Sequence, residues 1–135
     1  MDRPEIPLIL KAIEREKVTP AMLALFLPAF NGEPGGLVGL AEKIAAGAVV
    51  YSAMRGELVA GYFVARVDGV EFEVLAGVGA HGDNILPEVL PMAERLAVDM
   101  GLAAVTFETW RGGLMRKSAA MGYRGVSARF WKAVM

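Results

Sequence analysis

The chain has 135 residues, about the size of one domain, and it is long enough to bury a two-layer core. Its formal net charge of −1 gives no long-range attraction for nucleic acid or for an anionic membrane surface. The sequence has no cysteine and a single histidine, His81, which excludes disulfides and cysteine-based zinc sites and argues against a metal site. We therefore expect one domain over residues 1–135, without a metal, nucleic-acid or membrane partner.

Hydrophobic residues make up 55% of the chain without glycine, against about 45–50% with glycine counted in typical domains. Either the core is unusually full, or part of the surface is buried against other protein subunits. The longest uncharged stretch, 18–32, carries two prolines and is shorter than the roughly 18–20 residues of a membrane-spanning helix. The first residues combine acids and prolines with a very short apolar run, unlike a signal peptide.

The N-terminal part of the chain predicts a short strand over residues 6–10 and then a helix over 19–30. Thr19 suits the cap of this helix and Pro20 its first position, whereas Pro28 disturbs its end.

Residues 31–36, NGEPGG, are typical of a turn. Apolar residues at helical spacing then predict a second helix over 37–46, which Gly47 ends.

The middle of the chain changes to strand-like alternation, with strands predicted over 48–54, 57–67 and 70–78. Turns at Arg55-Gly56 and Asp68-Gly69 connect them, so the three strands form an antiparallel meander. Side chains in the third strand are predicted to alternate, with Glu71 and Glu73 on one face and Phe72, Val74 and Ala76 on the other.

The C-terminal part begins with a helix that ends at Gly101 and is predicted from one apolar stripe: Leu86, Leu90, Ala93, Ala97 and Met100. A strand over 103–109, a short helix over 112–122 and a strand over 127–134 follow. The predicted fold class is α+β or mixed α/β, with a central, mostly antiparallel sheet of about six strands and about four helices packed on its faces.

The loop between the third meander strand and the helix contains a literal G-x-G-x-x-G in Gly77, Gly79 and Gly82. A dinucleotide-binding fold needs this pattern near the start of a parallel βαβ unit. The hairpins before it are antiparallel, so we predict a bulge-and-turn role for Gly77 and Gly79.

The order of elements resembles that of the GNAT-type acetyltransferase superfamily, most clearly in GDNILPEVLPMAERLAVDMGLAAVTFET (82–109) and RGGLMRKSAAMGYR (111–124). It is also similar to small acetyltransferase-like proteins of tailed bacteriophages, some of which are virion components. The resemblance implies that a bulge makes the fourth strand diverge from the fifth and opens a site for acyl-CoA. Amides of the loop after the fourth strand would then bind the pyrophosphate at a helix N-terminus.

The phosphate loop that the resemblance implies departs from the family pattern. Counting back from Gly101, His81 takes the place of a basic or amide residue, while Asn84 and Leu86 replace glycines. Asp83 adds a negative charge where the pyrophosphate would approach, and Pro87 and Pro91 remove backbone donors.

The closing helix departs as well. Ser118 stands where the family often has a tyrosine that acts as general acid, and Gly112 stands where an asparagine often fixes the cofactor. Together these changes indicate a degraded acyl-CoA site.

Candidate catalytic residues follow from the need to take a proton from an amine. Glu73 is the best-placed base and Glu71 and Glu108 are weaker, although all three also fit solvated strand positions. Tyr123 is a candidate acid, or an aromatic residue packed against a sheet. A local basic cluster fits either the ribose phosphate of the cofactor or a solvated helix face: Arg111, Arg116, Lys117 and Arg124.

Two hypotheses follow. In the first, the chain is a CoA-dependent N-acyltransferase that moves an acetyl group from acetyl-CoA to an amine with Glu73 as base. Its cofactor-binding residues would be Val78, Gly79, Gly82, Asn84 and Arg116.

In the second hypothesis, the chain is a non-catalytic structural or assembly component, such as a virion protein, that needs no cofactor and binds other protein subunits. The degraded site and the high apolar content favour this second hypothesis. Under it the protein is cytoplasmic or virion-associated.

Overall fold

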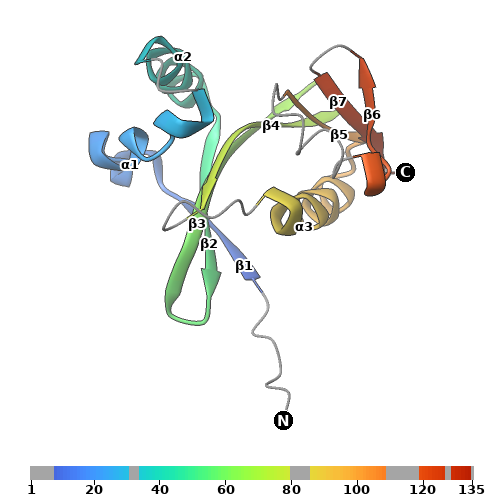
Figure 1. Ribbon diagram of the computed structural model, residues 1–135, viewed down its shortest axis with the longest axis horizontal. Helices are drawn as coiled ribbons and strands as arrows, with labels where there is room; N and C mark the ends of the chain where they lie inside the picture. Colours follow the sequence, from blue (N-terminus) through green and yellow to red (C-terminus); the bar gives the residue numbers. More distant parts are fainter. Residues whose placement is uncertain (1–7, 31–33, 80–85, 109–118, 127–128, 135) are drawn as a thin grey trace.

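The computed structural model describes residues 8–30, 34–79, 86–108, 119–126 and 129–134 (Figure 1). One seven-stranded sheet runs through them in the order β1-β2-β3-β4-β5-β7-β6. All neighbouring strands are antiparallel except β4 and β5, which are parallel. The strands are β1 (Leu8–Ile13), β2 (Val49–Arg55), β3 (Leu58–Asp68), β4 (Glu71–Gly79), β5 (Ala104–Glu108), β6 (Arg124–Val126) and β7 (Arg129–Ala133).

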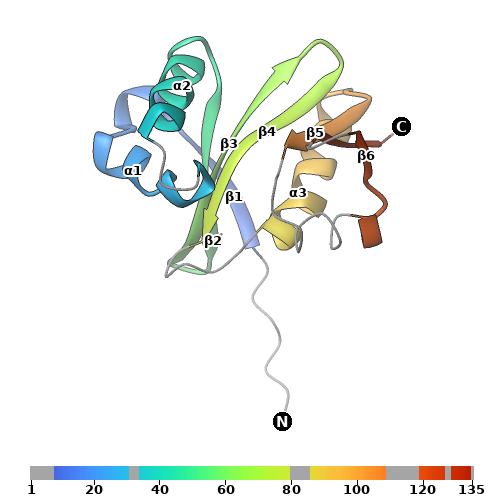
Figure 2. The ribbon, with the colours of Figure 1, turned by 45° about the horizontal axis from the view of Figure 1, so that its top comes forward.

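Three α-helices lie in the described residues: α1 (Pro20–Ala24), α2 (Pro34–Ala45) and α3 (Leu86–Asp99). Two short 3-10 turns, η1 (Arg15–Lys17) and η2 (Leu27–Phe30), flank α1. Helices α1 and α2 cover one face of the sheet, here called the α2 face, and α3 covers the opposite α3 face (Figures 1 and 2). None of these described helices is long and apolar enough to cross a membrane.

The predicted mixed α/β class with a mostly antiparallel sheet is confirmed, with one strand more than expected. The added strand is β6, which has three residues and is too short to show a sequence period. The first strand begins at Leu8 and extends to Ile13, because its whole length pairs with β2. The predicted closing helix, 112–122, lies mostly outside the described residues.

Helix α1 begins as the sequence predicts. The Thr19 Oγ1 accepts a hydrogen bond from the Met22 N–H at 3.2 Å, and Pro20 occupies the first turn. The helix ends earlier than expected, at Ala24, because the Leu25 and Phe26 N–H groups donate to the carbonyls three residues back, those of Met22 and Leu23, at 3.2 and 3.0 Å. The chain continues instead as η2.

Helix α2 corrects the predicted turn over 31–36, because its first turn includes Pro34, Gly35 and Gly36. Proline suits this position because its missing N–H would have no partner there. The predicted end at Gly47 is confirmed: this residue has φ = 120°, and the Ala48 N–H donates to the Lys43 carbonyl at 2.9 Å.

Helix α3 ends in the same way at Gly101, as predicted, with φ = 74° and a hydrogen bond of 2.8 Å from the Leu102 N–H to the Ala97 carbonyl. Its predicted stripe is partly corrected, because Met100 is exposed while Val89 is fully buried. The buried part of the helix packs on β4 and β5, which fixes the position of its first turn relative to the end of β4.

Each face of the sheet carries its own hydrophobic cluster. Tyr51 stacks on Phe63 at 4.8 Å between ring centroids on the α3 face. Further buried members on that face include Phe72, Leu90, Ala93, Val105 and Phe107. The α2 face has a separate cluster of Phe26, Leu40, Ile44, Ala48, Val50, Val64 and Ala76.

A bulge in β4 connects the two clusters. Ala76 lies opposite Val64 and Val74 lies opposite Ala65, so Leu75 is an extra residue in β4. Phe72 and Val74 therefore face α3, whereas Ala76 faces α2. The prediction that these three side chains share a face is wrong for Ala76, because the alternation is shifted by one residue at the bulge.

The predicted bulge role of Gly77 and Gly79 is also wrong. These residues pair in regular register with Phe63 and Gly61 of β3. A bulge in the fourth strand, which the resemblance implied, is confirmed at Leu75.

Two glycine substitutions test the helix assignments with opposite signs. Gly39→Ala in α2 should raise the free energy of unfolding by roughly 0.5–1 kcal/mol, because an added Cβ meets no atom within 4 Å and the backbone is helical. Gly101→Ala should lower it by roughly 1–2 kcal/mol, because φ at this position is +74°. Urea denaturation measures both, and equal signs would contradict the assignments.

Candidate functional site

The parallel strands β4 and β5 run together for only four residue pairs. Pairing begins at Glu71 with Ala104 and ends at Val74 with Phe107, immediately before the bulge. Beyond this point β4 continues through Leu75–Gly79 without β5 beside it (Figure 2). Among the described residues, backbone N–H and C=O groups of this segment that point away from β3 therefore have no strand partner, and such groups bind other hydrogen-bonding chains readily.

Two of the predicted cofactor-binding residues lie on this open edge of β4. Val78 pairs with Tyr62 of β3 and packs against the α2-face cluster, and Gly79 is buried opposite Gly61. The other predicted cofactor residues, Gly82, Asn84 and Arg116, lie outside the described residues. Their roles stay predictions.

Glu73 lies on β4 two residues before the bulge, on the α2 face. The Arg66 Nη2 and Nε donate to its Oε2 at 3.2 and 3.3 Å from the neighbouring position of β3. Only 19% of the Glu73 side-chain surface is exposed to solvent, so Glu73 is not a freely solvated strand residue. Both arginine contacts reach the same oxygen, and no hydrogen bond to the other oxygen, Oε1, is found in the described part of the chain.

The weaker base candidates are less well placed. Glu71 lies on the same face as Glu73 but at the start of β4, two pairs further from the bulge. Glu108 ends β5, and its side chain lies outside the described residues.

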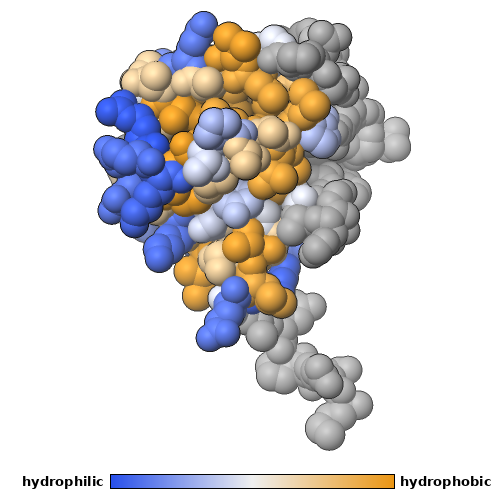
Figure 3. Space-filling model, turned by 90° about the vertical axis from the view of Figure 1, so that its left-hand side faces the viewer, coloured by the Kyte–Doolittle hydropathy of each residue, from blue (hydrophilic) through white to orange (hydrophobic). Residues whose placement is uncertain are grey.

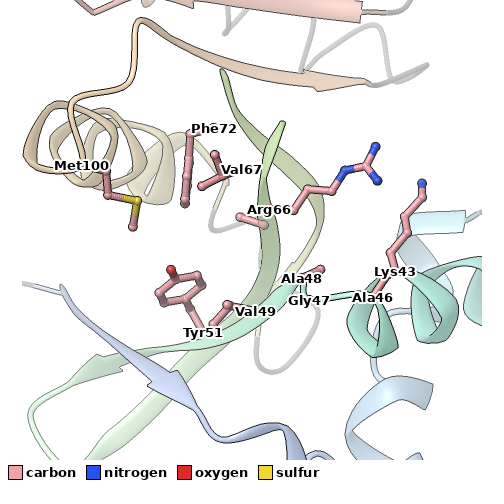
Figure 4. A pocket seen from close by; sticks show the side chains of 11 residues that line it. Lys43, Ala46, Gly47, Ala48, Val49, Tyr51, Arg66, Val67, Phe72 and Met100 are labelled. Atoms are coloured by element: carbon pink, nitrogen blue, oxygen red, sulfur yellow. The ribbon is translucent and has the colours of Figure 1, made fainter. Parts of the chain in front are cut away.

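A pocket of about 350 Å³ lies at the other end of β4, near Phe72 (Figure 4). Tyr51, Phe72 and Met100 line one side of it. Lys43 and Arg66 line it as well, but their charged ends point away from these apolar side chains (Figure 4). A ligand in this pocket would therefore contact the apolar side chains without also contacting the charged ends of Lys43 and Arg66. The pocket also lies away from the open edge of β4.

Comparison with known proteins decides the fold. No family model matches the sequence, and no curated protein matches it. Among solved structures, an IAA acetyltransferase from Bacillus cereus has a TM-score of 0.73 at 17% identity, over 93% of this chain and 99% of that one. The chain has the GNAT acetyltransferase fold.

Two further structures of this fold contain the cofactor. A Bacillus subtilis acetyltransferase in complex with CoA has a TM-score of 0.71 at 11% identity, over 95% of this chain and 99% of that one. A GNAT family acetyltransferase from Elizabethkingia anophelis with acetyl-CoA bound has a TM-score of 0.67 at 13% identity, over 89% and 78% of the two chains.

Tyr123, the predicted acid of this GNAT-fold chain, lies in the core with 4% of its surface exposed. Its ring meets Phe107 edge-on at 5.3 Å, so the packing role that the sequence allowed is confirmed. Burial, and then the nearby Glu94 carboxylate, raise the pKa of the Tyr123 hydroxyl well above its usual value. A buried hydroxyl that holds its proton so firmly is poorly suited to protonate a leaving group.

Sequence reasoning missed two polar neighbours of Glu73. Arg66 was not accessible to it, because the predicted turn at Asp68-Gly69 pairs residue 66 with Glu71, whereas the observed two-residue turn at Gly69–Val70 pairs it with Glu73. Thr106 of β5, which pairs with Glu73 on its other side, was not accessible, because no local signal sets the register of strands so distant in the sequence.

The Tyr123 hydroxyl has a testable effect on alkaline stability. The pKa of this hydroxyl is higher in the folded protein than in the unfolded chain, where it is about 10. The folded state therefore keeps its full stability below pH 10 and loses stability as the pH rises above 10, because only the unfolded chain then releases the proton readily. At pH 8, Tyr123→Phe should leave the free energy of unfolding unchanged or slightly raised, because the hydroxyl has no well-formed hydrogen bond in the described residues. Above pH 10, the free energy of unfolding of the variant should exceed that of the wild type by a margin that grows by up to about 1.4 kcal/mol per pH unit.

Urea denaturation at pH 8, 10 and 11 measures this difference. A variant that is less stable at pH 8 by more than about 1 kcal/mol would show instead that the hydroxyl is hydrogen-bonded.

Proposed function

We propose that the chain is a CoA-dependent N-acyltransferase that moves an acyl group to an amine. The observation that carries the proposal is the parting of β4 from β5 at Leu75, with a carboxylate beside the point of divergence. The similarity to GNAT-fold structures that contain CoA or acetyl-CoA supports it.

The open edge of β4 fits the extended, amide-containing arm of CoA. Amides of such an arm would hydrogen-bond the free N–H and C=O groups of Leu75–Gly79 as an added strand does. No β5 residue competes for these groups, since β5 pairs with β4 only as far as Val74. When bound, acyl-CoA supplies an acyl group that is activated as a thioester.

Glu73 would serve as the base. An amine with an unperturbed pKa near 10 is mostly protonated at neutral pH and must lose a proton before its nitrogen attacks the acyl carbon. Arg66 holds the Glu73 Oε2 and so fixes the side chain beside the bulge. The Oε1 remains to accept the proton, while the new C–N bond forms and the C–S bond breaks.

Acetyl-CoA and a Glu73→Gln variant test the proposal together. Acetyl-CoA at one hundred times its dissociation constant should stabilise the wild type by about 2.7 kcal/mol in a thermal shift series. Glu73→Gln should bind equally well but lose about 10²–10⁴-fold in kcat/KM, because the amide cannot accept the proton. Thiol release with a panel of primary amines measures turnover, and the chain itself has no cysteine to interfere.

Glu57→Gln is the matched control, since Glu57 is an exposed glutamate in the turn between β2 and β3. It should leave binding and turnover unchanged. Absence of any thermal shift at millimolar acetyl-CoA would overturn the proposed function. If Glu73→Gln keeps full activity, Glu73 is not the base of the reaction.

The second candidate function, a non-catalytic subunit of an assembly, is favoured by one observation. Large apolar side chains reach the surface on the side of α1 and α2, where orange areas alternate with blue ones (Figure 3). Exposed examples are Leu25, at the end of α1, and Val38, in α2. This candidate would hold if acetyl-CoA fails to bind and the protein sediments as an oligomer, and a virion location would be one form of it.

A further inference from the structure

The Thr106 hydroxyl is a buried polar group without an explanation in the fold. Thr106 is 1% exposed, and its Oγ1 has no hydrogen-bond partner among the described residues. An unpaired buried hydroxyl costs about 1–3 kcal/mol, whereas valine would fill the same space without this cost. Each such group in a folded protein calls for a specific reason.

Thr106 lies directly beside Glu73. Its neighbours in β5, Val105 and Phe107, both belong to the α3-face cluster, so alternation places the Thr106 side chain on the α2 face. Glu73 alternates with Phe72 and Val74 in the same way and shares that face. The register pairs the two residues across strands that are about 4.8 Å apart.

The pair stands at the end of the parallel ladder. Only Val74 and Phe107 pair beyond it before β4 bulges away from β5. On the other side of Glu73, Arg66 occupies one carboxylate oxygen and leaves Oε1 without a partner in the described residues. The free hydroxyl and the carboxylate with a free oxygen are therefore neighbours at the point where the open edge begins.

Buried polar groups that lack a protein partner are commonly satisfied by an ordered water with about three hydrogen bonds. We propose that Thr106 Oγ1 and Glu73 Oε1 hold one water molecule between them, which carries the proton from the acceptor amine to Glu73. This inference rests on the proposed acyltransfer function. Thr106 acts in it as a positioning residue, through the water and not on the substrate.

The two protein oxygens fix the orientation of the water. One water hydrogen is donated to Glu73 Oε1 and the other to Thr106 Oγ1, so that a lone pair of the water faces the amine. As the C–N bond forms and the C–S bond breaks, the amine proton moves to the water and the water gives a proton to Glu73 Oε1. Glu73 later releases this proton to solvent, and the departing thiolate takes one from solvent.

Two substitutions at Thr106 separate this role from a packing role. Thr106→Val keeps the volume and removes the hydroxyl, and it should lower kcat/KM by about tenfold or more with unchanged acetyl-CoA affinity. Thr106→Ser keeps the hydroxyl and should stay within about threefold of the wild type, although it loses a buried methyl group. A residue needed only for packing gives the reverse order, with valine tolerated and serine impaired.

The proton inventory of thiol release in mixed H₂O and D₂O is the second readout. Transfer through a water moves two protons and should give a curved inventory in the wild type and in Thr106→Ser. Retention of the curvature and of full kcat/KM in Thr106→Val would overturn the proposal.

A crystal structure that resolves ordered waters separates this inference from the proposed function. A water within hydrogen-bond distance of Thr106 Oγ1 and Glu73 Oε1 supports the bridge, and a direct contact or an empty site overturns it. If the wild type neither binds acetyl-CoA nor releases thiol, the proposed function fails and the relay role fails with it. The water position still decides whether the two oxygens share a bridge.

Discussion

The extra residue in β4 is the constraint on which the rest of the structure depends. Because Leu75 has no partner in β3, the strand rotates and its side chains change face at this point. Phe72 and Val74 can then pack under α3, while Ala76 packs under α2. The same rotation ends the ladder with β5 at Val74 and leaves the backbone groups that follow without a strand partner on this side in the part of the chain that the structure describes. Core packing and the candidate ligand edge thus have one cause.

A row of polar side chains crosses the sheet just before this bulge. Arg66, Glu73 and Thr106 occupy neighbouring register positions on β3, β4 and β5, on the face that α3 does not cover. A fold optimised for stability alone would place apolar residues there, since partly buried ion pairs contribute little and an unpaired hydroxyl costs free energy. Sites that break local rules in this way are typical of function. The row is therefore a better guide to chemistry than the buried Tyr123.

Much of the fold was predictable from local signals in the sequence. Gly47 and Gly101 end their helices in the left-handed conformation that glycine favours, and the Asp68-Gly69 pair lies where β3 turns into β4. The bulge position was not predictable, because it depends on packing against α2 and α3 and not on the glycines that follow.

The candidate site was predictable only in part for the same reason. Glu73 follows from its place on the last meander strand, whereas its pairing with Arg66 depends on a turn that lies one residue later than the predicted one. Thr106 depends on the pairing of β4 with β5, which α3 separates by a long stretch of chain. Tyr123 is a candidate acid by its residue type, yet its environment in the core decides its pKa.

The central claim is that the free edge of β4 after the bulge binds the acyl-CoA arm. Amide hydrogen exchange of residues 75–79, with and without saturating acetyl-CoA, tests it most directly. The account predicts that amides directed away from β3 exchange more slowly with the cofactor, while amides bonded to β3 are unaffected. Unchanged exchange along this whole segment would contradict it.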